Sequence, residues 1–184
     1  MHHGDTPHRR AQGGSARALE ARALEAWAEL PAILLDRHLT VLSSTALARA
    51  VSPSFFEGVN LAVYTFVDAA EEPCAERNDE SREQVVAMLR ESLDRHEPDE
   101  PFRRIVGELS TRSDVFAQSW AAETSARTSG VVLIPHDVVG PLALTYRQVR
   151  ADGDHTVVVL HPRSAQSRAA LTQLAEAVRE SDSV

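Results

Sequence analysis

The chain has 184 residues, which suits a single domain with a tail and is enough to bury a core without disulfides or a metal. It carries 27 acidic residues against 19 basic ones, all of them arginine, for a formal net charge of -8. The absence of lysine excludes Schiff-base chemistry and phosphate binding by a P-loop or kinase-type lysine. The negative charge also argues against direct binding to nucleic acid, because such binding depends on neutralising phosphates.

Nothing in the sequence points to secretion or to a membrane. Cys74 is the only cysteine, so no internal disulfide can form, and its acidic neighbours favour an inert thiol over a redox sensor. The first residues lack the apolar segment of a signal peptide, and no apolar run approaches the roughly 20 residues of a membrane span. We therefore expect a soluble, cytoplasmic protein, and the alanine-rich, all-arginine composition favours a bacterial source.

The N-terminal region is predicted to be a tail followed by one amphipathic helix. Residues 1–14 are rich in His and Gly and have almost nothing to bury, so we expect them to be disordered. A helix is predicted over 15–30, before the helix breaker Pro31, with one apolar stripe formed by Leu19, Ala23, Trp27 and Leu30. This stripe either associates with another chain or folds back on the domain that follows, and both alternatives stay open.

Two short strands are predicted next, at 32–35 and 39–42, joined by a tight turn. Residues 45–51 are predicted to form a short helix. The apolar stretch 55–66 fits a helix as well as a strand, and the acidic stretch 68–83 is typical of a solvated loop.

Three amphipathic helices are predicted in the middle of the chain, each with its own start signal. The first runs over 79–96, the second starts at Asp99 with Pro101 in its first turn, and the third starts at Ser113. Their apolar residues recur at helical spacing, so each helix presents one face to a core.

The last third of the chain changes to strands. Strands are predicted at 131–134, from 142 onwards and at 155–161, with an Asp-Gly turn before the last one and a final helix capped by Ser164. Strands segregated from helices indicate an α+β fold. We predict a PAS-like antiparallel sheet of about five strands over residues 31–180, with a helical insertion between strands 2 and 3. A pocket between such a sheet and its helices is a natural ligand site.

The sequence offers no recognisable catalytic or metal site. It has no nucleophile elbow, zincin motif, dinucleotide fingerprint or Cys-x-x-Cys pair. His155 and His161 lie on one predicted strand, but six residues at about 3.3 Å per residue place them too far apart to share a metal. His136, next to Asp137, is either a plain turn histidine or part of a ligand site. We therefore predict no catalytic residues, no metal and no cofactor.

The bulky apolar side chains of the helical insertion allow two interpretations. Each one taken alone is best explained as ordinary core. As a set they would line an elongated apolar cavity, and Arg127, just before the sheet resumes, would pair with a carboxylate head group. The candidate ligand-binding residues are Phe66, Met88, Leu89, Ile105, Phe116, Trp120, Arg127, His136 and Tyr146.

The order and spacing of several residues in the second half of the chain resemble the ligand-binding domain of MmyB-like transcription regulators. The matching positions, in order, are Phe116, Trp120, Gly130, His136, Val139, Gly140, Leu142, Leu144, Tyr146, Pro162 and Ser164. Upstream, the hairpin at 34–42 and the Asn60-Leu61 pair with Phe66 extend the resemblance over about residues 27 to 178.

The resemblance implies a PAS-like sensor domain that accommodates fatty-acyl ligands and usually follows a helix-turn-helix domain. The 26 residues before Trp27 are too few for such a DNA-binding domain. The chain also departs from the family pattern within the matched region. Ser44-Thr45 replaces a Trp-Asn pair, Val63 replaces an Arg, and Glu123 replaces a His.

These observations favour a non-enzymatic, PAS-like sensor domain that binds a small apolar, fatty-acid-like ligand and acts on transcription through a partner. The alternative is a protein-protein interaction or dimerisation module without a ligand, pairing with itself or with a DNA-binding regulator through the helix at 15–30. An enzyme is the least favoured of the three possibilities, because the sequence shows no nucleophile–base pair.

Overall fold

The computed structural model describes residues 22–68, 79–122 and 126–181, and the fold is α+β and PAS-like. Its five strands form one antiparallel sheet in the order β2-β1-β5-β4-β3. The strands are β1 (Ala32–Leu35), β2 (Val41–Ser44), β3 (Ser129–Ile134), β4 (Leu142–Ala151) and β5 (His155–Pro162). The helical insertion lies between β2 and β3, which confirms the predicted layout. The predicted tail and Cys74 lie outside the described residues.

The helices follow the start signals of the sequence closely. Asp99 accepts a hydrogen bond from the Phe102 N–H at 2.9 Å, and Ser113 caps the next helix in the same way through Phe116 at 3.2 Å. The stretch 55–66, which fitted helix or strand, forms a turn over residues 56–60, where Asn60 makes an isolated bridge to Thr40, and is helical from Leu61 on, ending in a π-helical segment. The helices are α2 (Ala46–Val51), the 3-10 turn η1 (Pro53–Phe55), α3 (Leu61–Val63), the π-helix η2 (Tyr64–Asp68), α4 (Asp79–Arg95), α5 (Glu100–Arg112), α6 (Asp114–Ala121) and α7 (Ala165–Ser181).

The turn between β1 and β2 is longer than predicted. The second strand begins at Val41 rather than at Leu39, because Leu39 has a φ of 66° and cannot continue a strand. The Asp36 carboxylate holds this turn by accepting the N–H groups of His38 and Thr40, both at 2.8 Å. The turn before β5 has three residues, 152–154, between the paired Ala151 and His155, and Gly153 and Asp154 in it take the left-handed conformation.

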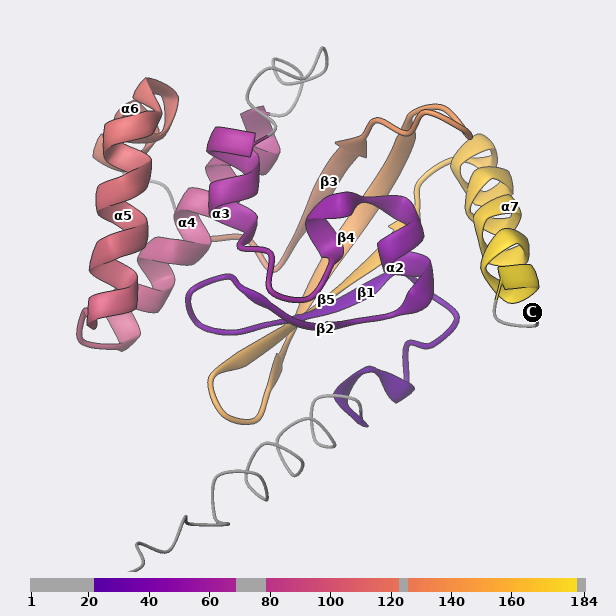
Figure 1. The fold of residues 1–184 in the computed structure, drawn as a ribbon, viewed down its shortest axis with the longest axis horizontal. Coiled ribbons are helices and arrows are strands. Elements are labelled where there is room, and N and C mark those ends of the chain that lie inside the picture. Colours follow the sequence, from indigo (N-terminus) through magenta and orange to yellow (C-terminus); the bar gives the residue numbers. More distant parts are fainter. Residues whose placement is uncertain (1–21, 69–78, 123–125, 182–184) are drawn as a thin grey trace, which may run out of the picture.

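The main core lies on the face of the sheet that the helices cover. Strand alternation places Ile33, Val158 and Leu160 on this face, where they pack with apolar residues of the helices. In the view of Figure 1, α4, α5 and α6 lie to the left of the sheet and α7 to its right, and all four helices contribute side chains to the same core. The position of α7 is fixed by Ser167, whose hydroxyl accepts the Ala143 N–H at 3.0 Å.

The opposite face of β1 and β5 is covered by the chain's own N-terminal segment. Residues 22–25 are helical and the chain then turns, so the described part of the predicted helix ends before residue 30. Leu24, which was not on the predicted stripe, is 5% exposed and packs with Leu34 and Val159. Trp27 and Leu30 pack against the same cluster. Of the two alternatives for this segment, its described part therefore takes the fold-back on its own domain.

Candidate ligand-binding pocket

A pocket of about 640 Å³ lies between the covered face of the sheet and the helices. Its floor is apolar and comes from four strands, which contribute Ile33, Val132, Ile134, Tyr146, Val158 and Leu160. A volume of about 300–1,000 Å³ with a mainly apolar lining and a few polar groups is typical of small-molecule sites. No helix in the described part of the chain is long and apolar enough to cross a membrane, and the described residues contain no cluster of metal ligands.

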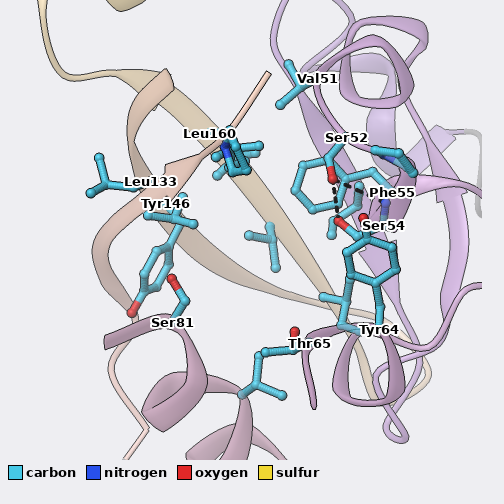
Figure 2. A pocket seen from close by; sticks show the side chains of 18 of the residues that line it. Val51, Ser52, Ser54, Phe55, Tyr64, Thr65, Ser81, Leu133, Tyr146 and Leu160 are labelled. Atoms are coloured by element: carbon cyan, nitrogen blue, oxygen red, sulfur yellow. Dashed lines mark hydrogen bonds between the residues drawn. The ribbon is translucent and has the colours of Figure 1, made fainter. Parts of the chain in front are cut away.

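One wall of the pocket is built from α2, η1 and the π-helix η2. Ser52 ends α2 and also caps η1, where its hydroxyl accepts the Ser54 N–H at 3.2 Å. The two serine hydroxyls are 2.8 Å apart and hydrogen-bond to each other (Figure 2). Phe55 and Tyr64 stand beside them on the same side of the pocket (Figure 2). Small hydroxyl side chains thus leave room where larger ones would fill it.

The other wall is the first half of α4, which is tied to the start of β3 by Gln84. The Gln84 side-chain amide accepts the Arg127 N–H at 3.0 Å and donates to the Arg127 carbonyl at 2.6 Å. Gln84 is 6% exposed, so this pair of bonds is shielded from water. Ser81, Val85 and Met88 line the pocket from the same helix.

Tyr146 stands on β4 where the floor meets α4, and its ring has room only because the residue opposite it on β3 is a glycine. Gly130 is its partner across the β3–β4 pair, and a Cβ at that position would lie 2.6 Å from the Tyr146 hydroxyl. The hydroxyl is buried and has no hydrogen-bond partner within the described residues. Burial raises the pKa of Tyr146 above its ordinary value, and Arg127 nearby opposes the shift.

His136 fastens the β3–β4 loop over the end of α2. Its Nε2 donates to the Ala50 carbonyl at 2.9 Å, while Nδ1 accepts from the N–H groups of Val138 and Val139 at 3.2 and 3.3 Å. These partners select the neutral tautomer with the proton on Nε2. Both ring nitrogens therefore hydrogen-bond to backbone groups, so holding this loop is a sufficient role for His136.

The structure distributes the nine predicted site residues between the pocket and the core. Met88, His136 and Tyr146 line the pocket. Phe66, Leu89 and Phe116 are buried in the core, and Ile105 and Trp120 pack against it. Arg127 does not line the pocket; its side chain is 54% exposed and lies 3.7 Å from Glu80. That any of the nine contacts a ligand stays a prediction.

Of the insertion helices, α5 and α6 contribute no side chain to the pocket lining, because their aromatic side chains interlock with the π-helix. Phe66 meets Phe116 edge-on with ring centroids 5.2 Å apart, and Phe116 stacks on Trp120 at 5.5 Å. The Arg90 guanidinium lies 4.9 Å from the Trp120 ring centroid. This packing fills the space between the π-helix, α5 and α6, so the open volume lies between the sheet and α2, η1 and α4.

Ser52, Ser54 and Arg82 are among the lining residues that sequence reasoning missed. Ser52 and Ser54 gave no signal, because a pocket made by small residues leaves no pattern of apolar periodicity. Arg82, which also lines the pocket, is one of 19 arginines, and nothing in its spacing distinguishes it.

A second group of charged side chains lies where the β1–β2 turn meets α5. Asp99 forms an ion pair with Arg37 and hydrogen-bonds to His38 Nε2 at 3.0 Å. The Phe102 N–H, together with Arg37 and His38, holds the pKa of the Asp99 carboxyl well below its usual range. Asn60 adds a neutral link by donating to the His38 carbonyl at 2.7 Å.

The sequence model of the MmyB-like transcription regulator ligand binding domain matches residues 17–174, which is most of the chain. The comparison with curated proteins finds no match. The family match runs from the N-terminal segment on the back of the sheet to α7, so it includes every strand and the whole pocket.

Proposed function

Because the chain belongs to the family of MmyB-like transcription regulator ligand-binding domains, we propose that its pocket binds a small, largely apolar molecule of the fatty-acyl class. Binding of that molecule changes how the domain acts on a transcription regulator. The family is a ligand-binding domain of transcription regulators, which supports the sensor role. We place this activity in the cytoplasm and assign it no cofactor.

The observation that carries the proposal is the pocket of about 640 Å³ with its floor of strand residues. Ile33, Val158 and Leu160 present only hydrocarbon to it. A buried methylene contributes about 0.8 kcal/mol, so an acyl chain laid on this floor gains several kcal/mol before the costs of association.

A non-catalytic role agrees with the chemistry of the lining. His136 is held by three backbone groups, so its nitrogens are not available as a general base. Ser52 and Ser54 hydrogen-bond to each other rather than to a base. Neither of these two serines is therefore paired with an activating base.

The test is stabilisation of the full chain by saturated fatty acids from C8 to C18. A ligand that binds only the folded state stabilises it by RT ln(1 + [L]/Kd), which is about 2.7 kcal/mol at a hundredfold excess over Kd. We expect a rise in Tm that depends on chain length, and an acyl molecule released from denatured protein in mass spectrometry. An unchanged Tm across the series with no molecule released would favour the ligand-free interaction module.

A pocket-filling variant and a matched control make this test specific. Val85 lines the pocket, and Val85→Phe is expected to fill part of its volume and remove the rise in Tm. Val115 lies on α6 with 45% exposure and does not line the pocket, so Val115→Phe is expected to keep the rise. If both variants respond like the wild type, the acyl molecule binds elsewhere.

A further inference from the structure

The pocket contains an arginine whose charge is poorly satisfied by its neighbours. Arg82 lies in the first turn of α4 and lines the pocket, with a side chain that is 14% exposed. Among the described residues its ion partner is Asp79, 3.5 Å away, and Asp79 is 77% exposed. A guanidinium offers five N–H donors and forms its strong contacts with carboxylates at about 2.7–2.9 Å. Within the part of the chain that the structure describes, the long contact with Asp79 uses little of that capacity.

The contact with Asp79 is also easy to replace. Ion pairs with a solvent-exposed partner contribute little, because water competes for the exposed carboxylate. A carboxylate that enters from the pocket side meets Arg82 in a more enclosed setting, where a charge-assisted hydrogen bond is stronger. The energetic balance therefore favours an anionic group in the pocket over Asp79.

The other arginines near the pocket are better satisfied or lie farther out. Arg49 also lines the pocket, but its guanidinium donates to the Ser44 carbonyl at 2.6 Å and contacts the Ser44 hydroxyl at 3.3 Å. Arg127 is 54% exposed, pairs with Glu80 and does not line the pocket. Of these three cations, Arg82 is the one that combines enclosure with free donor capacity.

We propose that the pocket selects ligands with a free carboxylate at one end of an apolar tail, and that Arg82 binds this carboxylate. The tail lies over the strand floor, against Ile33 and Val158, away from the charged end. Ser81 precedes Arg82 and stands beside Tyr146 (Figure 2), so two hydroxyl side chains of the lining lie at the same end of α4 as Arg82. This inference rests on the proposed function and specifies the head group of the ligand as a free carboxylate, which esters, amides and alcohols lack.

The experiment compares three ligands of equal chain length with the full chain: dodecanoate, 1-dodecanol and methyl dodecanoate. Binding is measured by calorimetry at pH 8, below the concentration at which dodecanoate forms micelles. We expect wild type to bind dodecanoate at least about tenfold more tightly than the two neutral ligands, which corresponds to about 1.4 kcal/mol. In Arg82→Gln the three ligands are expected to bind equally, at the Kd of the neutral ones. Arg82→Lys keeps the charge and is expected to retain part of the preference.

Arg127→Gln is the matched control, because it removes the same charge close to α4 but outside the pocket. It is expected to keep the preference for dodecanoate. Tm and circular dichroism without ligand show that each variant is folded, and binding of 1-dodecanol by Arg82→Gln shows that its pocket is intact.

The outcomes separate this inference from the proposed function. Binding of 1-dodecanol without any preference for dodecanoate overturns the role of Arg82 and leaves an apolar-ligand sensor. A preference that survives Arg82→Gln, or that disappears in Arg127→Gln instead, also overturns it. Failure of all three ligands to bind wild type removes the proposed function itself.

Discussion

Removal of the Tyr146 hydroxyl is expected to stabilise the protein. The hydroxyl is buried and unpartnered among the described residues, while the ring packs in the core and covers Gly130. A buried polar group without a partner costs about 1–3 kcal/mol, and Tyr146→Phe removes that cost while keeping the ring. We expect a gain near the lower limit, about 1 kcal/mol, which is a rise in Tm of about 2–4 °C for a chain of this size.

Urea unfolding of wild type and Tyr146→Phe without ligand measures this gain. The two transitions are expected to have equal slopes, so that a higher midpoint reports stability alone. A variant less stable than wild type by about 0.5–1.5 kcal/mol, the usual contribution of one hydrogen bond, would refute the reasoning and show that the hydroxyl is bonded in solution.

The gain from Tyr146→Phe is also expected to grow at high pH. Burial raises the pKa of Tyr146 above its ordinary value of 10.0. Below that value the tyrosine is neutral in both the folded and the unfolded state. Above it the unfolded state loses its proton first, so wild type loses stability as pH rises through the pKa of the folded state. Phe has no proton to lose, so the difference between the two proteins widens above pH 10.0.

Three further substitutions test the supports around the pocket. Gly130→Ala is expected to lower the unfolding free energy by about 1–3 kcal/mol, measured in urea, because the new methyl group overlaps the Tyr146 ring; an unchanged midpoint would mean that the ring is free to move. Thr45→Ala is expected to lower the unfolding free energy by about 0.5–2 kcal/mol through loss of the α2 cap. The loss is expected to be larger still, because the Thr45 hydroxyl also donates to the Leu30 carbonyl and accepts from the Ala32 N–H. Thr45→Ser keeps the hydroxyl and is expected to retain most of the wild-type stability. The pKa of Asp99 is lowered in the folded protein from its ordinary value of 3.8, so this carboxyl stabilises the fold while it is ionised and ceases to do so as the pH falls through its folded-state pKa. Asp99→Asn is therefore expected to lose less stability on acidification below pH 3.8 than wild type does. If the unfolding free energies of wild type and Asp99→Asn fall equally as the pH is lowered, this role of Asp99 is contradicted.

Elements with strong local signals were predictable from the sequence. The first strand, 32–35, has the predicted bounds, and the caps Asp99 and Ser113 begin α5 and α6 as expected. Both cases depend on residues that are neighbours in the chain. The order of strands and helices then restricted the fold to a PAS-like sheet, which the structure has.

The position of the pocket was not predictable, because it depends on which distant side chains meet. Large apolar residues at helical spacing show that a face is buried, but they do not show whether it packs tightly or leaves a cavity. Of the residues expected around a cavity, Phe66, Phe116 and Trp120 pack on one another, whereas Met88 and Tyr146 line the pocket. The left-handed Leu39, which delays β2, likewise depends on the hydrogen bonds of Asp36 to the following backbone.

The pocket persists without being filled by its own walls because polar contacts between distant segments hold them apart. Gln84 fixes α4 to the start of β3, and His136 fixes the β3–β4 loop to the end of α2. Closing the pocket would require moving one of these walls and breaking its bonds. A Gln84 left without partners would be a buried polar group, at a cost of about 1–3 kcal/mol. A ligand that enters this space buries the apolar floor while the walls stay where they are, which is the arrangement expected of a preformed binding site.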